Sequence, residues 1–223
     1  MKAAIFDMDG TLVDSLMLWD LLWTGLGEKY RHDPAFRPSE EDDKAVRTLT
    51  LPAAMELIHS RYQLGESGEE LLHIATEAMV DFYAHRVKAK PGVREFLECC
   101  RTHGVRMCIA SATAPELVQL ALEHCGIAGY FETVFSCGTL GVGKDKPDVF
   151  LLAQKHLGAP PEETWVFEDS LVAVETAVKA GLPVVGIYDR YNFGQEQIKA
   201  IASLYVGPGE SMEKLLKEPV LFP

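Results

Sequence analysis

Two different patterns of apolar and polar positions divide this 223-residue chain near residue 90. Between residues 16 and 85, apolar side chains recur every three or four positions, which is the period of amphipathic helices. Within this stretch Ser67 is followed three residues later by Glu70, a capping-box spacing that predicts the start of a helix running to about His85. The stretch therefore predicts helices and no strand.

After Lys90-Pro91-Gly92 the pattern changes to short apolar runs that alternate with helical periods. Strands are expected at Ala3–Phe6, Val105–Ala110, Val134–Ser136, Trp165–Phe167, Val184–Ile187 and Leu204–Val206. Helices are expected at Val93–His103, Pro115–Cys125, Pro147–His156, Leu171–Ala180, Gln195–Ala202 and Met212–Leu216. Such alternation is typical of an α/β, doubly wound parallel sheet covered by helices on both faces. The predicted core domain is residues 1–14 plus 90–223, and residues 15–89 form an all-helical insertion after the first strand.

Charge and composition narrow the range of partners. The chain carries 33 acidic and 21 basic residues, a net charge of −12, which disfavours nucleic acid and anionic membranes and favours a small-molecule partner. The N-terminus leads directly into the first strand, and no apolar run approaches the roughly 20 residues of a membrane span. Five cysteines without a C-x-x-C spacing favour buried free thiols in a reducing cytoplasm, and the scattered histidines indicate no zinc site. The pattern does not specify an oligomeric state.

The first strand ends on two carboxylates, Asp7 and Asp9, followed by Gly10. A buried strand has no use for an aspartate at its end unless the carboxylate serves something outside the sheet, and ligands bind at this end of open α/β sheets. Gly10 permits a turn with positive φ. Because one residue separates them, Asp7 and Asp9 should point in different directions, which suits a nucleophile and an acid/base. The alternative is a turn with surface aspartates.

Polar residues also end two later strands. Ser111 precedes a predicted capping box of Thr113 and Glu116, so a hydroxyl and free backbone N–H groups converge at a helix N-terminus, which is an anion site. Glu168 and Asp169 end another strand, where paired acids near Asp7 could bind a hard divalent cation. An ordinary helix cap would explain Thr113 equally well, and a surface acidic pair that caps the next helix is the alternative for Glu168 and Asp169.

A glycine-rich loop, Gly141 to Lys146, supplies the basic residues Lys144 and Lys146 just before a helix. A lysine at this position could reach a phosphate and offset the repulsion between carboxylates. The alternative is a solvated loop lysine.

These motifs resemble the haloacid dehalogenase-like hydrolase superfamily. The segment from Asp7 to Asp14, D-M-D-G-T-L-V-D, resembles its motif I, and Ser111, the 143–150 loop and Glu168-Asp169 resemble the other three in order. Counting back from Pro147-Asp148 places Lys144 at the motif lysine, with Asp145 in place of the usual proline.

The resemblance implies a Mg²⁺-dependent phosphatase that hydrolyses a small organic phosphate monoester through an aspartyl-phosphate intermediate. Asp7 would be the nucleophile and Asp9 the acid/base. The implied phosphate-binding residues are Ser111, Ala112 and Lys144. The implied Mg²⁺ ligands are Asp7, the Asp9 main-chain carbonyl and Asp169, with Glu168 in or next to the ligand set.

The helical insertion resembles the C1 cap of subfamily I, and Asp9 argues against the dehalogenase branch. Asp14, Trp19 and Arg47 are candidate substrate contacts, although a Trp pair such as Trp19 and Trp23 more often belongs to the cap core, and Arg47 more often is an exposed cap arginine. A β-phosphoglucomutase-like mutase is the alternative. Its phosphate-gripping Lys-Gly pair and arginine fall here on Arg47-Thr48 and Leu51, an incomplete set. A catalytically silent binding protein on this core is the second alternative, which no motif position favours.

Overall fold

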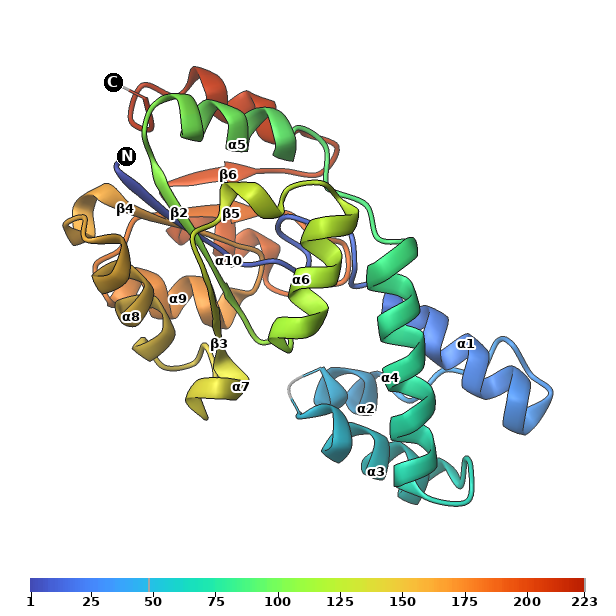
Figure 1. Ribbon diagram of the computed structural model, residues 1–223. Coiled ribbons are helices and arrows are strands. Elements are labelled where there is room, and N and C mark those ends of the chain that lie inside the picture. Colours follow the sequence, from blue (N-terminus) through green and yellow to red (C-terminus); the bar gives the residue numbers. More distant parts are fainter. Residues whose placement is uncertain (48, 223) are drawn as a thin grey trace. The chain divides into compact units, whose positions relative to one another are not determined.

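The computed structural model describes residues 1–47 and 49–222 and contains a six-stranded parallel sheet (Figure 1). Its strands are β1 (Ala3–Phe6), β2 (Arg106–Ser111), β3 (Val134–Ser136), β4 (Thr164–Glu168), β5 (Val184–Ile187) and β6 (Leu204–Val206). The strand order is β3-β2-β1-β4-β5-β6, with every neighbouring pair parallel. The α/β prediction is therefore confirmed, and the order reverses at β1, where open sheets of this kind form a crevice at the carboxyl ends.

Helices cover both faces of the sheet. Figure 1 shows α5 (Val93–Thr102) above the sheet and α8 (Asp148–Leu157) and α9 (Leu171–Lys179) below it. Side chains alternate between the faces along β1: Ile5 belongs to the core formed with α8 and α9, whereas Phe6 contacts Phe96 of α5. This period of two, with both faces apolar, is what a sheet buried on both sides requires.

The other helices and turns that accompany the sheet complete this part of the chain. They are α6 (Pro115–His124), α7 (Cys137–Leu140), α10 (Gln195–Ile201) and three 3₁₀ turns, η1 (Ala128–Tyr130), η2 (Pro161–Glu163) and η3 (Met212–Lys217). The sequence did not predict α7, η1 or η2, because three or four residues are too few to show a hydrophobic period. The predicted capping box before α6 is wrong: the N-cap is Ala114, with no side-chain cap.

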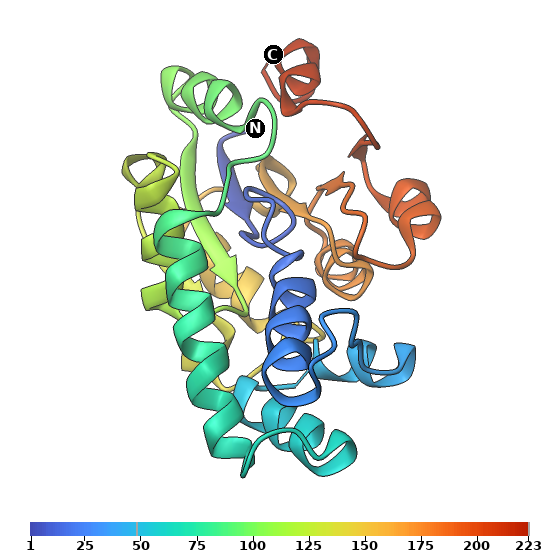
Figure 2. The ribbon, with the colours of Figure 1, turned by 90° about the vertical axis from the view of Figure 1, so that its right-hand side faces the viewer.

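Residues 17–86 form a second compact unit, here the helical unit; residues 1–16 and 87–223 form the first, the sheet unit. The helical unit contains α1 (Leu18–Arg31), α2 (Glu40–Val46), α3 (Leu51–Tyr62) and α4 (Gly68–His85) (Figure 2). Its core includes Leu22, Trp23, Leu26, Met55, Ile58 and Leu71. The Ser67 hydroxyl accepts the Glu70 N–H at 3.1 Å, so the predicted cap of α4 is confirmed.

The two segments that flank the helical unit pair with each other inside the sheet unit. The Asp14 N–H donates to the Lys88 carbonyl and the Lys90 N–H to the Leu12 carbonyl, both at 2.9 Å. An antiparallel bridge joins Val13 and Ala89 between them. The outgoing and returning chain are thus fixed side by side where the insertion begins and ends.

All five cysteines are free thiols. Cys100, Cys108 and Cys137 are buried, whereas Cys99 and Cys125 are partly exposed, contrary to the expectation that all five are buried. Across residues 1–47 and 49–222, no helix combines the length and apolarity that a bilayer crossing requires.

Candidate active site

Three buried carboxylates meet at the carboxyl end of β1 and β4. One oxygen each from Asp7, Glu168 and Asp169 lies within 4.8 Å of the others. They converge because β1 pairs with β4 in the register Phe6 to Phe167, and the Asp7 N–H extends the pairing by donating to the Phe167 carbonyl at 2.9 Å. Three anionic oxygen ligands in one buried site fit a hard divalent cation such as Mg²⁺.

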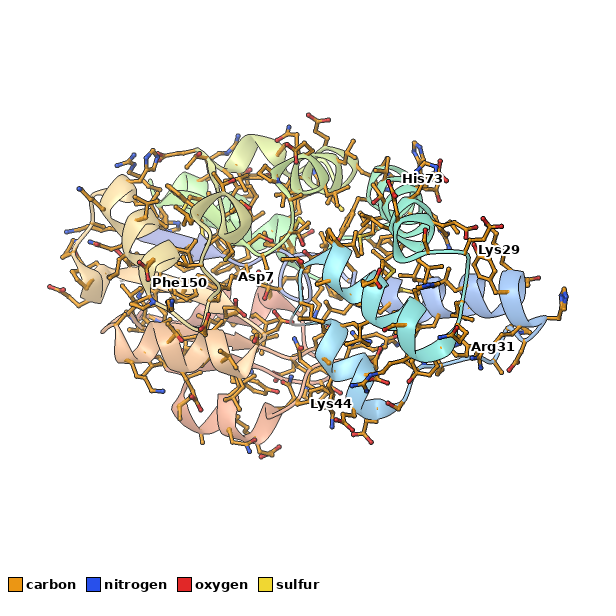
Figure 3. The ribbon with its side chains drawn as sticks, turned by 90° about the horizontal axis from the view of Figure 1, so that it is seen from below. Asp7, Lys29, Arg31, Lys44, His73 and Phe150 are labelled. Atoms are coloured by element: carbon orange, nitrogen blue, oxygen red, sulfur yellow. The ribbon has the colours of Figure 1, made fainter. Side chains whose placement is uncertain are left out.

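Lys144 is the lysine that the structure brings to these carboxylates. Its Nζ donates to Asp7 Oδ1 and, at 2.5 Å, to Glu168 Oε1, and its side chain is only 11% exposed. Nζ also lies 6.0 Å from the centre of the Phe150 ring on α8; Figure 3 labels Phe150 and Asp7 in the sheet unit. Lys146 is exposed, so it does not compete for this position.

As far as the structure describes the chain, the site holds three acidic groups and one basic group, and burial and repulsion between the acids shift their pKa values. Burial raises the pKa of Asp7 to about 7; the carboxylates of Glu168 and Asp9 add to this, and Lys144 opposes it. Burial likewise raises the pKa of Asp169 well above its ordinary value, with Asp7 and Glu168 adding to the effect. Burial alone would lower the pKa of Lys144, but Asp7 and Glu168 raise it above its ordinary range, so Nζ stays charged. One lysine facing three carboxylates leaves room for a further cation.

Glu168 is held more completely than the other two acids. Besides Lys144 at Oε1, its Oε2 accepts the backbone N–H groups of Asp169 at 2.8 Å and Ser170 at 2.9 Å. Ser170 is the N-cap residue of α9, so Glu168 satisfies N–H groups that the start of the helix leaves unpaired. Glu168 thereby fixes Lys144 in the site.

Asp9 is held by a different set of partners from Asp7. Its Oδ1 accepts the Ser15 hydroxyl at 2.5 Å, and its Oδ2 accepts the Thr113 hydroxyl at 2.7 Å. The Thr113 side chain thus binds a carboxylate across the site instead of capping α6. The two motif I carboxylates meet separate groups, which agrees with the expectation that they point in different directions.

Gly10 is required for two reasons. Its φ of +81° lies in the region that favours glycine, and a Cβ at this position would overlap the carboxylate of Asp169. The next residue, Thr11, donates its hydroxyl to Asp169 Oδ1 at 2.9 Å. The turn after β1 therefore leaves room for the Asp169 carboxylate at Gly10 and holds it by the hydrogen bond from Thr11.

Two of the three predicted phosphate-binding residues, Ser111 and Ala112, lie at the end of β2. Ser111 is the last residue of the strand and is buried, and its Oγ accepts the Thr113 N–H at 3.0 Å. Ala112 is exposed in the loop that follows. Ser111 pairs with Ser136 of β3, whose buried hydroxyl meets no hydrogen-bond partner within the described part of the chain.

Several polar residues of the site were not identified from the sequence. Thr11 and Ser15 lie in or next to motif I, and their hydroxyl side chains were the signal that could have pointed to them. Asn192 donates its side-chain amide to Asp169 Oδ2, yet it follows β5 in a loop without any motif. Its role depends on where that loop folds, which local sequence does not show.

The candidate substrate contacts lie in both units. Asp14 belongs to the sheet unit and lines a cavity of about 370 Å³ together with Lys90 and Asp189. In the helical unit the Trp19 ring lies 5.5 Å from the ring of the buried Trp23 and is itself partly buried.

Arg47 forms a two-point pair with Asp43. Its Nε donates to Oδ2 at 3.0 Å and its Nη2 to Oδ1 at 3.3 Å. Its guanidinium lies 5.9 Å from the centre of the Trp19 ring. Thr48, the predicted neighbour of Arg47 in the gripping pair, lies outside the described residues.

Charged and polar side chains lie on the surface of the helical unit. Figure 3 shows Lys29, Arg31, Lys44 and His73 on it, and the Lys44 Nζ pairs with Glu40 at 2.6 Å one helical turn away. Such a solvated face is ordinary for amphipathic helices.

Comparison with known proteins agrees with the geometry. A family model described as haloacid dehalogenase-like hydrolase matches residues 1–181. A phosphorylated carbohydrates phosphatase of Thermotoga maritima is 28% identical over 220 residues, which cover 98% of this chain and 99% of that protein. Hexitol phosphatase B of Escherichia coli is 28% identical over 170 residues, 76% of this chain and 75% of that protein. A crystal structure from Thermotoga maritima, provisionally assigned as a β-phosphoglucomutase, has a TM-score of 0.80 at 26% identity, covering 98% of this chain and all of that one.

Proposed function

This chain belongs to the haloacid dehalogenase-like hydrolase family, and we propose that it is a Mg²⁺-dependent phosphatase acting on a small phosphorylated carbohydrate. The observation that carries the proposal is the buried group of Asp7, Glu168 and Asp169 around Lys144, with Asp9 held nearby by separate partners. The names of the two phosphatase relatives support a sugar or sugar-alcohol phosphate as the substrate class.

In the proposed reaction, Asp7 attacks phosphorus and becomes an aspartyl phosphate while the alcohol leaves. Asp9 donates a proton to the leaving oxygen and later takes one from the water that cleaves the acyl phosphate. The Thr113 and Ser15 hydroxyls, which donate to Asp9, keep its carboxylate oriented for both steps. The Lys144 ammonium and the donors around Ser111 and Ala112 stabilise the negative oxygens of the transferring group.

Asp7, Asp169 and the Asp9 main-chain carbonyl would hold Mg²⁺, with Glu168 beside them. When bound, the cation would neutralise charge on the phosphoryl oxygens and on the carboxylates themselves. The excess of buried negative charge over positive charge at this site supports that assignment.

We propose that residues 15–89 act as a cap that selects the substrate, with Asp14, Trp19 and Arg47 as candidate contacts. The ion pairs that Arg47 and Lys44 form in the helical unit favour a phosphatase over a mutase. A mutase must also hold a second phosphate in its cap. Arg47 is engaged by Asp43 and Lys44 by Glu40, so both basic groups already face an acid.

The free thiols agree with a reaction in the cytoplasm.

Phosphate release from a panel of hexose, pentose and hexitol phosphates tests the proposal, with and without Mg²⁺. A phosphatase releases inorganic phosphate from at least one class, and chelation of the metal stops it. Conversion of a hexose 1-phosphate to its 6-phosphate, without release, would replace the proposal by the mutase. Mg²⁺ binding without turnover of any compound would favour the binding protein.

Magnesium should stabilise the protein more at pH 8 than at pH 5. The pKa of Asp7 rises on folding from its ordinary value near 3.8 to about 7, so the folded protein binds more protons than the unfolded chain between these values. Stability of the metal-free protein therefore falls as pH rises from about 4 to about 7. Metal binding needs the ionised carboxylates, so Mg²⁺ at roughly 100 times its Kd should raise Tm by roughly 5–10 °C at pH 8 and by much less at pH 5.

Thermal melts at both pH values, with NaCl matched in ionic strength, measure this difference. Asp169→Asn should remove most of the shift at pH 8. Equal shifts at the two pH values would contradict metal binding by protonatable carboxylates.

A further inference from the structure

We propose that Asn192 is a positioning residue that holds the Asp169 carboxylate ready for the divalent cation. The inference rests on the proposed Mg²⁺ site and adds to it a residue from the loop after β5. Asn192 touches neither Asp7 nor Lys144 through any hydrogen bond that the described residues make; it acts through Asp169 alone.

Asp169 is held differently from the other acids of the cluster. Lys144 donates to Asp7 and Glu168, whereas within the described residues no lysine or arginine forms an ion pair with Asp169. Its two oxygens instead accept neutral donors, Oδ1 from the Thr11 hydroxyl and Oδ2 from the Asn192 amide. Asp169 is 2% exposed, so these two donors replace the water that would otherwise solvate its charge.

The direction of the amide follows from the chemistry of its partner. When Asp169 ligates a cation its ionised carboxylate can only accept hydrogen bonds, and in this structure the Asn192 side-chain N–H donates one to Oδ2. Two neutral donors fix the rotation of the carboxylate, yet they add no positive charge that would repel a cation. A lysine in place of Asn192 would supply the same bond but would compete with the metal.

The loop that carries Asn192 is organised by Asp189. Its Oδ1 accepts the Tyr191 N–H at 2.9 Å, and its carbonyl accepts the Asn192 N–H and the Gln195 side-chain amide, both at 3.2 Å. Such an aspartate-centred turn fixes the backbone of the residues that follow it. Asn192 is therefore placed by several bonds before any ligand arrives.

A buried ion pair anchors this turn to the rest of the sheet unit. The Lys90 Nζ lies 2.8 Å from Asp189 Oδ2 and also donates to the Tyr188 carbonyl at 2.8 Å. The two side chains are 13% and 3% exposed, so the pair is shielded from solvent. Lys90 itself is fixed by its backbone bond to Leu12, close to the turn that carries Gly10 and Thr11. Lys90 thus links the segment that carries Thr11 to the loop that carries Asn192, and these two residues are the donors to Asp169.

Asn192→Leu tests the inference, because leucine keeps the volume and loses the donor. Mg²⁺ affinity of the purified full-length protein, measured by isothermal titration calorimetry without substrate, should fall about 10- to 100-fold. Raising Mg²⁺ to saturation should restore most of kcat and leave KM for the substrate unchanged, which general damage to the fold would not do. Asn192→Ser, too short to reach Asp169, should give the same result should the leucine variant fail to fold.

Tyr205→Phe is the matched control. It removes the hydrogen bond at 3.0 Å from the Tyr205 hydroxyl to Gln195, which braces the same loop but does not reach Asp169. Its Mg²⁺ affinity should stay within about twofold of the wild-type value, since the Asn192 amide keeps its contact.

The outcomes distinguish a failure of the Asn192 proposal from a failure of the proposed phosphatase. One outcome is that the wild-type protein binds Mg²⁺ while the folded Asn192 variants bind it equally or more tightly. That result would overturn the role of Asn192 and would leave the proposed phosphatase unaffected. Equal losses of affinity in Tyr205→Phe and Asn192→Leu would reduce Asn192 to a structural member of the loop. A wild-type protein that binds no Mg²⁺ would overturn both proposals.

Discussion

Replacing Asp7 by Asn should lower kcat by at least about 10⁴-fold and leave the fold intact. Asparagine has nearly the same shape, but its amide cannot act as the nucleophile. The substitution also removes a buried carboxylate whose pKa is raised to about 7 by burial and by repulsion from Glu168 and Asp9. The metal-free variant should therefore be at least as stable as the wild type at pH 8, because a costly buried charge is gone.

Turnover and thermal melts of the Asp7→Asn protein measure both effects. Asp145→Asn is the matched control, because Asp145 is an exposed acid in the loop next to Lys144. The control should keep its activity within about twofold, as surface substitutions usually do. Appreciable turnover by Asp7→Asn would remove Asp7 from the role of nucleophile.

Replacing Lys144 by Met should have the second largest effect, on both activity and stability. The buried ammonium that contacts Asp7 and Glu168 disappears, so the metal-free protein should lose about 3–5 kcal/mol of unfolding free energy, the usual result of removing one partner of a buried ion pair. Turnover should fall about 10²- to 10³-fold, since a cation that stabilises the transferring phosphoryl group is lost.

Lys146→Met is the control that the loop itself provides. Lys146 is exposed two residues away, so its loss should change Tm and kcat little. Mg²⁺ should recover part of the stability of Lys144→Met, because it replaces positive charge between the same carboxylates. Comparable losses in both lysine variants would show that the loop, rather than the Lys144 ammonium, matters.

The acidic residues of the candidate active site could be found from the sequence because each lies at the end of an apolar run. Asp7 and Asp169 are acids at strand ends, and a parallel sheet places such ends at one edge. The order of β1 beside β4 and β2 then brings these residues together, as the pattern predicted. Counting along the motif already favoured Lys144 over Lys146, and the structure adds that Lys144 is buried against Asp7 whereas Lys146 is exposed.

The helical unit shows where sequence reasoning loses detail. Helical periodicity predicted that this stretch is all-helical, and the spacing of Ser67 and Glu70 predicted the cap of α4, because both depend on residues close in the chain. The ion pair between Arg47 and Asp43 could also have been predicted, because the two residues are four positions apart. The hydrogen bond from the Trp23 indole to Asp43 at 2.8 Å could not, because it depends on how two helices pack.

The sequence by itself determined the α/β class, the positions of the strands, the acids at their ends and the all-helical stretch after the first strand. These features follow from local periodicity and from the unusual presence of charge at the end of a buried run. Only the tertiary structure decided which side chains hold those acids: Thr113 to Asp9, and Thr11 with Asn192 to Asp169. The physical reason is that a hydrogen bond between residues far apart in the chain leaves no periodic trace in either segment. It exists only once the sheet has set the distance between them.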